Sequence, residues 1–309
     1  MEKKILITVD GSSYSRRAIE YTVKMESVLQ DLHFTLLNIQ PKISEFLIED
    51  AKMDGKARAA LKKVINKNQA KSTEILNESK EIMIDLGVDK NKIELVSQPI
   101  AMGIAKGILD YGNQALADAI VMGRRGVSRL AEAFIGSVTN SVLEHTGVTP
   151  VWAIGGAVTS SKVMIAVDGS ESALCAVDHA AFFLGNNPDI EITLLHIAPR
   201  LRDYCTIDFD DEGDPLREVI AQGDKKCIDT FYIQAKQKFL DAGLSESQIN
   251  IKQVTSKINI GKTIVKEAED GGYGTLVIGR RGANNSFFMG SVSRFILTNA
   301  SNCAVWLVP

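Results

Sequence analysis

Glycine and hydroxyl residues gather in one short stretch whose spacing could hold an anion. Gly123 and Gly126 are separated by two residues, and the pair Gly136 and Ser137 follows after nine more. Glycines let the main chain approach an anion closely with its N–H groups turned inward. The N–H groups at the start of a helix also favour negative charge. The stretch therefore predicts a phosphate-binding loop, with the hydroxyl groups of Ser137 and Thr139 as further donors.

Three arginines lie near these glycines and could offset anionic charge. They are Arg124, Arg125 and Arg129. The alternative interpretation is a strand-to-helix turn that needs its glycines only for their shape. The second Gly-Ser pair, the apolar strand pattern before the motif and the helix pattern after it favour the phosphate interpretation.

An aspartate follows the first apolar run of the chain. Asp10 comes directly after residues 5–9 and is followed by Gly11 and Ser12. A carboxylate at the end of such a strand can accept hydrogen bonds from ribose hydroxyls. Asp10 could also cap the helix that begins near Ser12, and the two roles are compatible. The main chain near Ile39, at the end of the second expected strand, would be placed to bond the edge of an adenine.

These features occur twice along the chain. The repeated segments are residues 5–12 and 163–170, 36–39 and 194–197, 121–126 and 277–282, 136–138 and 290–292, and 151–152 and 305–306. Two copies of one unit explain these matches, and the small residues 155–161 are typical of a linker. We therefore expect two domains, residues 1–156 and 157–309.

Strand and helix patterns alternate in the first copy. Short apolar runs predict strands at 5–9, 34–39, 93–96, 119–122 and 148–154. Helical spacing of apolar residues predicts a helix through Ala18, Thr22, Met25 and Leu29, a long helix ending at Gly87, and helices at 102–111 and 137–146. This alternation predicts an α/β fold in which each copy is a doubly wound, Rossmann-like parallel sheet of five strands. Ligands of such sheets bind beyond the carboxyl ends of the strands.

Composition excludes several classes of protein. The 309 residues are 45% hydrophobic and 24% charged, which argues against disorder. Only 6% are aromatic and the net charge is −3, so a nucleic-acid partner is not expected. The apolar run after Lys4 is too short for a signal peptide or a membrane span. The four cysteines form no C-x-x-C pair, and we expect reduced thiols in a cytoplasmic protein without a membrane partner.

With these motifs in place, the sequence resembles the universal stress protein family, in its tandem two-domain, ATP-binding form. The resemblance rests on the Val-Asp-Gly-Ser strand end, on Leu-Leu-His-Ile at 194–197 and on the glycine motif. It implies that the aspartate contacts ribose, that the main chain after the second strand binds adenine, and that the glycine motif holds phosphates. It also implies an adenine-nucleotide fold and a role in the stress response.

The resemblance assigns a set of site residues to each copy. The first set is Asp10, Gly11, Ser12, Ile39, Gly123, Arg124, Gly126, Gly136, Ser137, Val138 and Thr139. The second set is Asp168, Ile197, Gly279, Gly282, Gly290, Ser291, Val292 and Ser293. The second copy departs from the motif, because seven residues without a basic side chain replace the nine of the first copy. We therefore expect the first copy to hold the better site.

Binding of ATP or AMP, with or without Mg²⁺, in a regulatory protein with little or no turnover is the expected function. An adenylating or slowly ATP-hydrolysing enzyme of the same superfamily is one alternative, and an interaction scaffold with degenerate sites is another. No general base faces a nucleophile in any motif, so no catalytic residue is predicted, and no metal-ligand spacing is present.

The last strand of each copy would be an exposed sheet edge in an isolated domain. We expect residues 149–152 and 304–307 to pair antiparallel within the chain, as a pseudo-dimer that resembles the pairing of single-domain family members. The sequence leaves open whether two chains associate further, and it leaves open the role of the acidic segment from Arg202 to Pro215.

Overall fold

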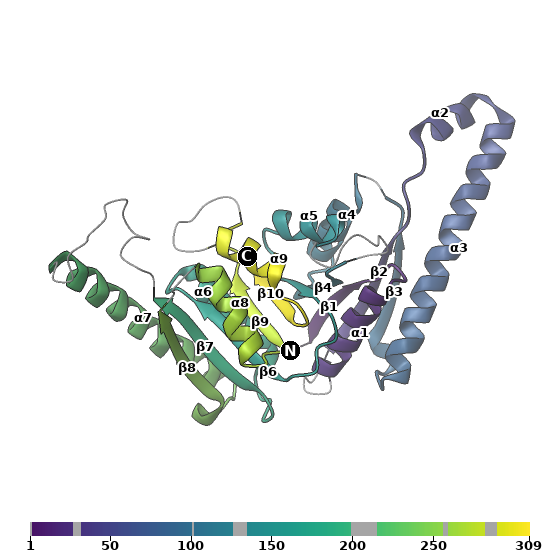
Figure 1. Ribbon diagram of the computed structural model, residues 1–309. Coiled ribbons are helices and arrows are strands. Elements are labelled where there is room, and N and C mark those ends of the chain that lie inside the picture. Colours follow the sequence, from purple (N-terminus) through teal and green to yellow (C-terminus); the bar gives the residue numbers. More distant parts are fainter. Residues whose placement is uncertain are drawn as a thin grey trace. The chain divides into compact units, whose positions relative to one another are not determined.

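The chain folds into two compact units, Met1–Ile154 and Gly155–Pro309. A computed structural model describes residues 2–26, 32–100, 102–125, 135–198, 215–255, 259–281 and 289–309 (Figure 1). The two units are called unit 1 and unit 2.

The sheet of unit 1 is parallel throughout. Its strands are β1 (Lys3–Thr8), β2 (Leu32–Ile39), β3 (Ile93–Gln98), β4 (Ala119–Gly123) and β5 (Val151–Ile154). They lie in the order β3-β2-β1-β4-β5, and every neighbouring pair is parallel. The chain thus runs outward from β1 in both directions, which confirms the doubly wound α/β fold that the sequence predicts. The carboxyl ends of β1, β2 and β4 meet at one edge.

Helices cover both faces of this sheet. The helices of unit 1 are α1 (Ser13–Glu26), α2 (Glu45–Met53), α3 (Gly55–Asp85), α4 (Ile104–Gln114) and α5 (Ser137–His145), with a 3₁₀ turn, η1 (Lys90–Lys92). The helices α1 and α3 pack on one face, and α4 and α5 pack on the other (Figure 1). Ala18, Thr22 and Met25 are buried as their spacing predicts, whereas Leu29 lies outside the described residues.

Two predicted boundaries in unit 1 are displaced. The fifth strand begins at Val151 rather than at Val148, whose side chain is 79% exposed. Pro150 has no N–H for the sheet ladder, which explains why regular pairing starts after it. The helix expected from Met102 begins at Ile104, and Met102 is 71% exposed.

Unit 2 repeats the architecture of unit 1. Its strands are β6 (Lys162–Val167), β7 (Glu191–Ala198), β8 (Ile249–Thr255), β9 (Thr275–Gly279) and β10 (Ala304–Val308). They lie in the order β10-β9-β6-β7-β8, again parallel throughout. The helices are α6 (Glu171–Leu184), α7 (Pro215–Asp241), α8 (Ile260–Asp270) and α9 (Ser291–Asn299), with the 3₁₀ turn η3 (Glu246–Gln248). The helices α6 and α7 pack on one face, and α8 and α9 on the other.

Each core contains one fully buried tryptophan beside a residue of its first helix. In unit 1, Trp152 packs edge-on to Tyr21, with ring centroids 6.3 Å apart. In unit 2, Trp306 packs edge-on to His179, with centroids 5.6 Å apart. Burial lowers the pKa of His179 to about 3, because the apolar surroundings disfavour the charged ring. The ring is therefore neutral in the folded protein near pH 7.

Candidate functional site

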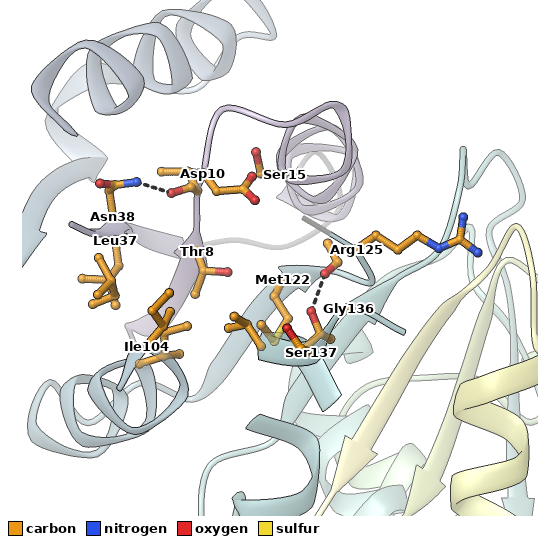
Figure 2. A pocket seen from close by; sticks show the side chains of 16 residues that line it. Thr8, Asp10, Ser15, Leu37, Asn38, Ile104, Met122, Arg125, Gly136 and Ser137 are labelled. Atoms are coloured by element: carbon orange, nitrogen blue, oxygen red, sulfur yellow. Dashed lines mark hydrogen bonds between the residues drawn. The ribbon is translucent and has the colours of Figure 1, made fainter. Parts of the chain in front are cut away.

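A cavity of about 200 Å³ opens at the carboxyl edge of the sheet in unit 1 (Figure 2). Its walls come from the ends of β1, β2 and β4 and from the first turns of α1, α4 and α5. The lining residues are Thr8, Val9, Asp10, Ser15, Leu37, Asn38, Ile39, Ile104, Ile108, Met122, Gly123, Arg125, Gly136, Ser137, Val138 and Thr139. Seven of the predicted site residues are in this wall: Asp10, Ile39, Gly123, Gly136, Ser137, Val138 and Thr139.

Asp10 is held at the rim of the cavity by the turn that follows β1. Its Oδ1 accepts a hydrogen bond from the N–H of Ser12 at 3.0 Å. Gly11 adopts φ +76°, a left-handed conformation that favours glycine. The side-chain hydroxyl of Ser12 accepts a hydrogen bond from the N–H of Ser15 at 3.2 Å and so caps the N-terminus of α1. Ser12 rather than Asp10 therefore serves as the helix cap, and the exposed Asp10 lines the cavity.

Asn38 is a polar residue of this wall that the sequence reasoning missed. Its side-chain amide is buried and donates to the carbonyl of Val9 at 2.7 Å (Figure 2). The N–H of Val9 in turn donates to the carbonyl of Leu37 at 2.9 Å, so the ends of β1 and β2 are tied together. A polar residue between the apolar residues Leu37 and Ile39, at the end of the strand, is the signal that could have found it.

Apolar side chains also line the cavity, beside the polar residues Asp10 and Asn38. Ile104 and Ile108 come from α4, Leu37 from β2 and Met122 from β4. Figure 2 shows Ile104 and Leu37 on the side of the cavity where Asn38 lies. An apolar floor with a few polar groups at its edges is the usual composition of a small-molecule pocket.

The first turn of α5 supplies main-chain donors to the cavity. Gly136 caps this helix, and the first hydrogen bond along it runs from the N–H of Asn140 to the carbonyl of Gly136 at 2.8 Å. The N–H groups of Ser137, Val138 and Thr139 therefore precede the hydrogen-bond ladder of the helix. Such groups and the helix dipole favour an anion at this point.

Two residues of the glycine motif have structural roles in the described part of the chain. Thr139 is buried, and its hydroxyl donates to the carbonyl of Gly123 at 2.9 Å, which joins α5 to β4. A Cβ on Gly123 would lie 2.7 Å from the main chain of Tyr14 in α1. Gly123 is thus required for the close packing of α1 on β4, whereas Gly126 and Arg129 lie outside the described residues.

The arginine in the cavity wall is Arg125, not Arg124. Arg124 is only 7% exposed, its N–H donates to the carbonyl of Ile154 and its carbonyl accepts from Gly136. Arg125 donates to the hydroxyl of Tyr14 at 3.2 Å, and its guanidinium lies 5.7 Å from the centre of that ring. In Figure 2 its side chain extends away from Asp10.

Unit 2 repeats several of these contacts. Asp168 accepts from the N–H of Ser170 at 3.1 Å, and Gly169 adopts φ +77°. His196 occupies the place of Asn38 and contacts the carbonyl of Val167 through Nδ1 at 3.0 Å. Ile197 is buried in β7.

At its candidate phosphate end, unit 2 has a helix that corresponds to α5, but its described residues contain no counterpart of the contact between Arg125 and Tyr14. Ser293 donates to the carbonyl of Gly279 at 2.8 Å, as Thr139 does to Gly123. Gly290 caps α9, which begins at Ser291 and continues through Val292 and Ser293. The residue that corresponds to Tyr14 is Ser172, whose hydroxyl accepts from the N–H of Arg281 at 3.4 Å. Gly282 lies outside the described residues.

The described residues contain no group of three or more His, Cys, Asp or Glu side chains placed to hold a metal ion. They also contain no helix that is long and apolar enough to cross a membrane.

A model of the Universal stress protein family matches the chain twice, over residues 1–154 and over residues 159–309. The chain belongs to the universal stress protein family. It is a tandem member with two family domains, as its internal repeat and its motifs predict.

Individual family members are distant in sequence. A universal stress protein of Mycolicibacterium smegmatis is 22% identical over 201 residues, which cover 63% of this chain and 64% of the relative. The chain thus spans less than two thirds of that relative's length. Universal stress protein YxiE of Bacillus subtilis is 26% identical over 145 residues, which cover 46% of this chain and 92% of the relative.

A solved structure shares the fold over the whole chain. The crystal structure of a universal stress protein from Archaeoglobus fulgidus matches with a TM-score of 0.66 at 19% identity. The match covers 99% of this chain and 97% of that chain, and it confirms the fold of both units.

Proposed function

We propose that unit 1 binds an adenine nucleotide, ATP or AMP, in the cavity at the carboxyl edge of its sheet, as part of a regulatory role in the stress response. The observation that carries the proposal is the convergence of a carboxylate, Asp10, and the N-terminus of α5 on one apolar cavity. A carboxylate suits ribose hydroxyls and a helix N-terminus suits phosphate, so the two ends of the cavity match the two polar parts of a nucleotide.

The residues that line the cavity would each contact one part of the nucleotide. The main chain of β2 at Ile39, beside the Asn38 contact, would meet the adenine edge, and Ile104 and Met122 would contact its faces. The N–H groups of Ser137 and its neighbours would hold phosphate. The cavity volume of about 200 Å³ is below the roughly 300–1,000 Å³ of typical ligand pockets, which favours a nucleotide that is only partly enclosed.

Arg125 would provide the positive charge near the phosphates, in place of Arg124. Several charge-assisted hydrogen bonds, each contributing about 1.5–3 kcal/mol, would supply micromolar affinity after the cost of association. Mg²⁺ could accompany the phosphates of ATP, bound through the nucleotide's own oxygens.

The proposal is binding without rapid turnover. An enzyme that adenylates a substrate or hydrolyses ATP slowly is the second candidate, and a scaffold with degenerate sites is the third. An assay of phosphate and pyrophosphate release distinguishes the first two candidates. Repeated turnover would favour the enzyme, and its absence would favour binding alone. Nucleotide released on denaturing the purified protein separates binding from a pure scaffold.

Calorimetric titration with a proline variant tests the phosphate end directly. Ser137 is the first residue of α5, where proline is tolerated because its missing N–H has no partner within the helix. Gly136 has φ −59° and ψ 145°, which the residue before a proline readily adopts. Ser137→Pro therefore removes one N–H and one hydroxyl from the cavity and leaves the helix in place.

The expected result is a loss of ATP affinity of about tenfold or more in Ser137→Pro. Ser291→Pro is the matched control in unit 2, because Gly290 has nearly the same backbone angles, φ −60° and ψ 149°. The control should retain the tighter ATP site. Equal ATP affinity in the wild type and Ser137→Pro would contradict the proposed phosphate position.

A further inference from the structure

The exposed face of α3 carries charges that change sign halfway along the helix. Lysines occupy its first half at 56, 63 and 67, and acidic residues occupy its second half at 74, 78, 81 and 85. These residues are spaced by three, four or seven, so they share one face of the helix. All seven are exposed, and none lines the nucleotide cavity. We call these seven residues the charged stripe.

The stripe is separate from the faces by which α3 packs in unit 1. Ser72, Leu76, Ser79 and Met83 of its second half are buried on the side of α1, β2 and β3. Its first half packs against α2, and Figure 1 shows that this pair of helices extends beyond the sheet of unit 1. Among the described residues of unit 1, the stripe is therefore exposed and lies away from the packed faces of α3.

The order of charges is the reverse of the one that stabilises a single helix. Acidic side chains favour the start of a helix and basic ones its end, but α3 has no acidic residue in its first turn and no basic residue in its last. Neighbours of like charge also repel at spacings of three or four, as in Lys63 with Lys67 and Glu81 with Asp85. An ion pair at the change of sign opposes this trend: Lys71 Nζ lies 2.9 Å from Glu74 Oε2.

The same order is self-complementary between two antiparallel copies of α3. The centre of symmetry lies between Ala70 and Lys71, close to the middle of the 31-residue helix. Lys67 and Glu74 are equally far from this point, as are Lys63 and Glu78, and Lys56 and Asp85. In an antiparallel pair each lysine would therefore oppose an acidic residue of the other copy. Such pairing also places each helix end against a charge that suits its dipole.

We propose that the charged stripe is a docking surface for a second copy of this chain, through two-fold antiparallel pairing of α3. The surface would be isologous, with the same patch on both partners. Ala60 and Ala70 on the same face are small and exposed, which permits close approach of the two helices. Exposed ion pairs are individually weak and are screened by salt, so the dimer is expected to be reversible and favoured at low ionic strength.

Charge reversal tests this pairing by sedimentation velocity of the full chain over a range of concentrations. One variant carries Lys56→Glu, Lys63→Glu and Lys67→Glu, so its stripe is wholly acidic. A second carries Glu74→Lys, Glu78→Lys and Asp85→Lys, so its stripe is mostly basic. Each variant alone should show a dimer dissociation constant raised at least about tenfold, because its stripe then repels its copy. An equimolar mixture of the two should restore the dimer.

The matched control for the first variant lowers the net charge by the same amount as that variant, at positions away from the stripe. It carries Lys90→Glu, Lys162→Glu and Lys225→Glu, all at exposed positions, and should dimerise as the wild type does. Circular dichroism checks folding, which the first variant should keep because acidic residues at a helix start favour the helix. A wild type that is monomeric at low salt, a dimer that the triple variants leave unchanged, or a mixture that stays monomeric would each overturn the proposal.

Discussion

Unit 1 and unit 2 have the same sheet order and the same turn after the first strand, but they differ at the end of the candidate site that would receive phosphate. Asp10 and Asp168 are held alike, and α5 and α9 begin alike after a capping glycine. In unit 1 an arginine of the motif contacts Tyr14, whereas Ser172 stands at the corresponding place in unit 2. A duplicated fold can thus keep the turns that build a site while the side chains around it diverge.

The largest difference in stability between the units is expected from adding one carbon at the end of β4 in unit 1 or of β9 in unit 2. In Gly123→Ala the new Cβ would lie 2.7 Å from the main chain of Tyr14, which cannot rotate away. In Gly279→Ala the nearest atom, at 2.5 Å, is the hydroxyl of Ser172, and the main chain is 3.0 Å away. Thermal unfolding should show a loss of about 1–3 kcal/mol for Gly123→Ala and a smaller loss for Gly279→Ala. Equal losses would contradict this account of the packing.

The next largest effect is expected at the two aspartates. Asp10→Asn keeps an oxygen that can accept from the N–H of Ser12 but removes the charge that would bind ribose hydroxyls. Because a hydrogen bond to a charged group contributes about 1.5–3 kcal/mol, ATP affinity should fall about tenfold to a hundredfold. Asp168→Asn is the matched change in unit 2 and should affect the tighter site little. Calorimetric titration of both variants decides between the units.

The two units should also differ in how their free energy of unfolding depends on acid pH. His179 has a pKa near 3 in the folded protein and an ordinary value of 6.5, so the unfolded state binds a proton between these values and the folded state does not. The stabilisation is therefore complete above pH 6.5 and declines as pH falls below it, by up to about 1.4 kcal/mol per pH unit. The corresponding position in unit 1 holds Tyr21 in place of a histidine.

Each unit has its own tryptophan with which to measure this effect. In Trp152→Phe the fluorescence of Trp306 reports unit 2, and in Trp306→Phe that of Trp152 reports unit 1. Denaturant unfolding at several pH values should show a steeper decline between pH 6.5 and 4 for unit 2. His179→Tyr, which copies the residue of unit 1, should reduce that decline. An unchanged slope would show that other groups cause it.

The smallest effect on nucleotide affinity is expected at Arg125 and Arg281, which follow the buried arginines Arg124 and Arg280. Arg125→Met removes a half-buried charge from the cavity wall and should lower ATP affinity about threefold to tenfold, with less effect on AMP. Arg281→Met is its counterpart in unit 2. Competition titrations with ATP and AMP measure the difference, and an equal loss for both nucleotides would place Arg125 away from the outer phosphates.

The fold could be predicted from the sequence because the internal repeat and the alternation of strand and helix patterns each extend over many residues. Strand runs, helix spacing and the Asp-Gly turn all agree with one parallel architecture, and the left-handed φ of Gly11 explains why glycine follows Asp10. Boundaries were less predictable, since Val148 continues the apolar pattern but Pro150 delays the strand. The antiparallel pairing of the last strands stays a prediction.

The candidate site was less predictable because side-chain direction depends on packing. Spacing did not distinguish Arg124, which is buried, from Arg125, which lines the cavity. Asn38 was missed because its amide donates to the main-chain carbonyl of Val9 in the neighbouring strand end, a contact that spacing does not indicate. Gly123 was assigned to an anion from the spacing of the glycine motif between a strand and a helix pattern, whereas its contact with α1 depends on how closely two elements pack.

A crystal structure of the full chain grown with ATP tests the central claim most directly. The account predicts nucleotide density in unit 1, with ribose beside Asp10 and phosphate at the N–H groups of Ser137 to Thr139, and higher occupancy there than in unit 2. A nucleotide bound only elsewhere, or a cavity in unit 1 that stays without nucleotide at saturating ATP, would contradict it.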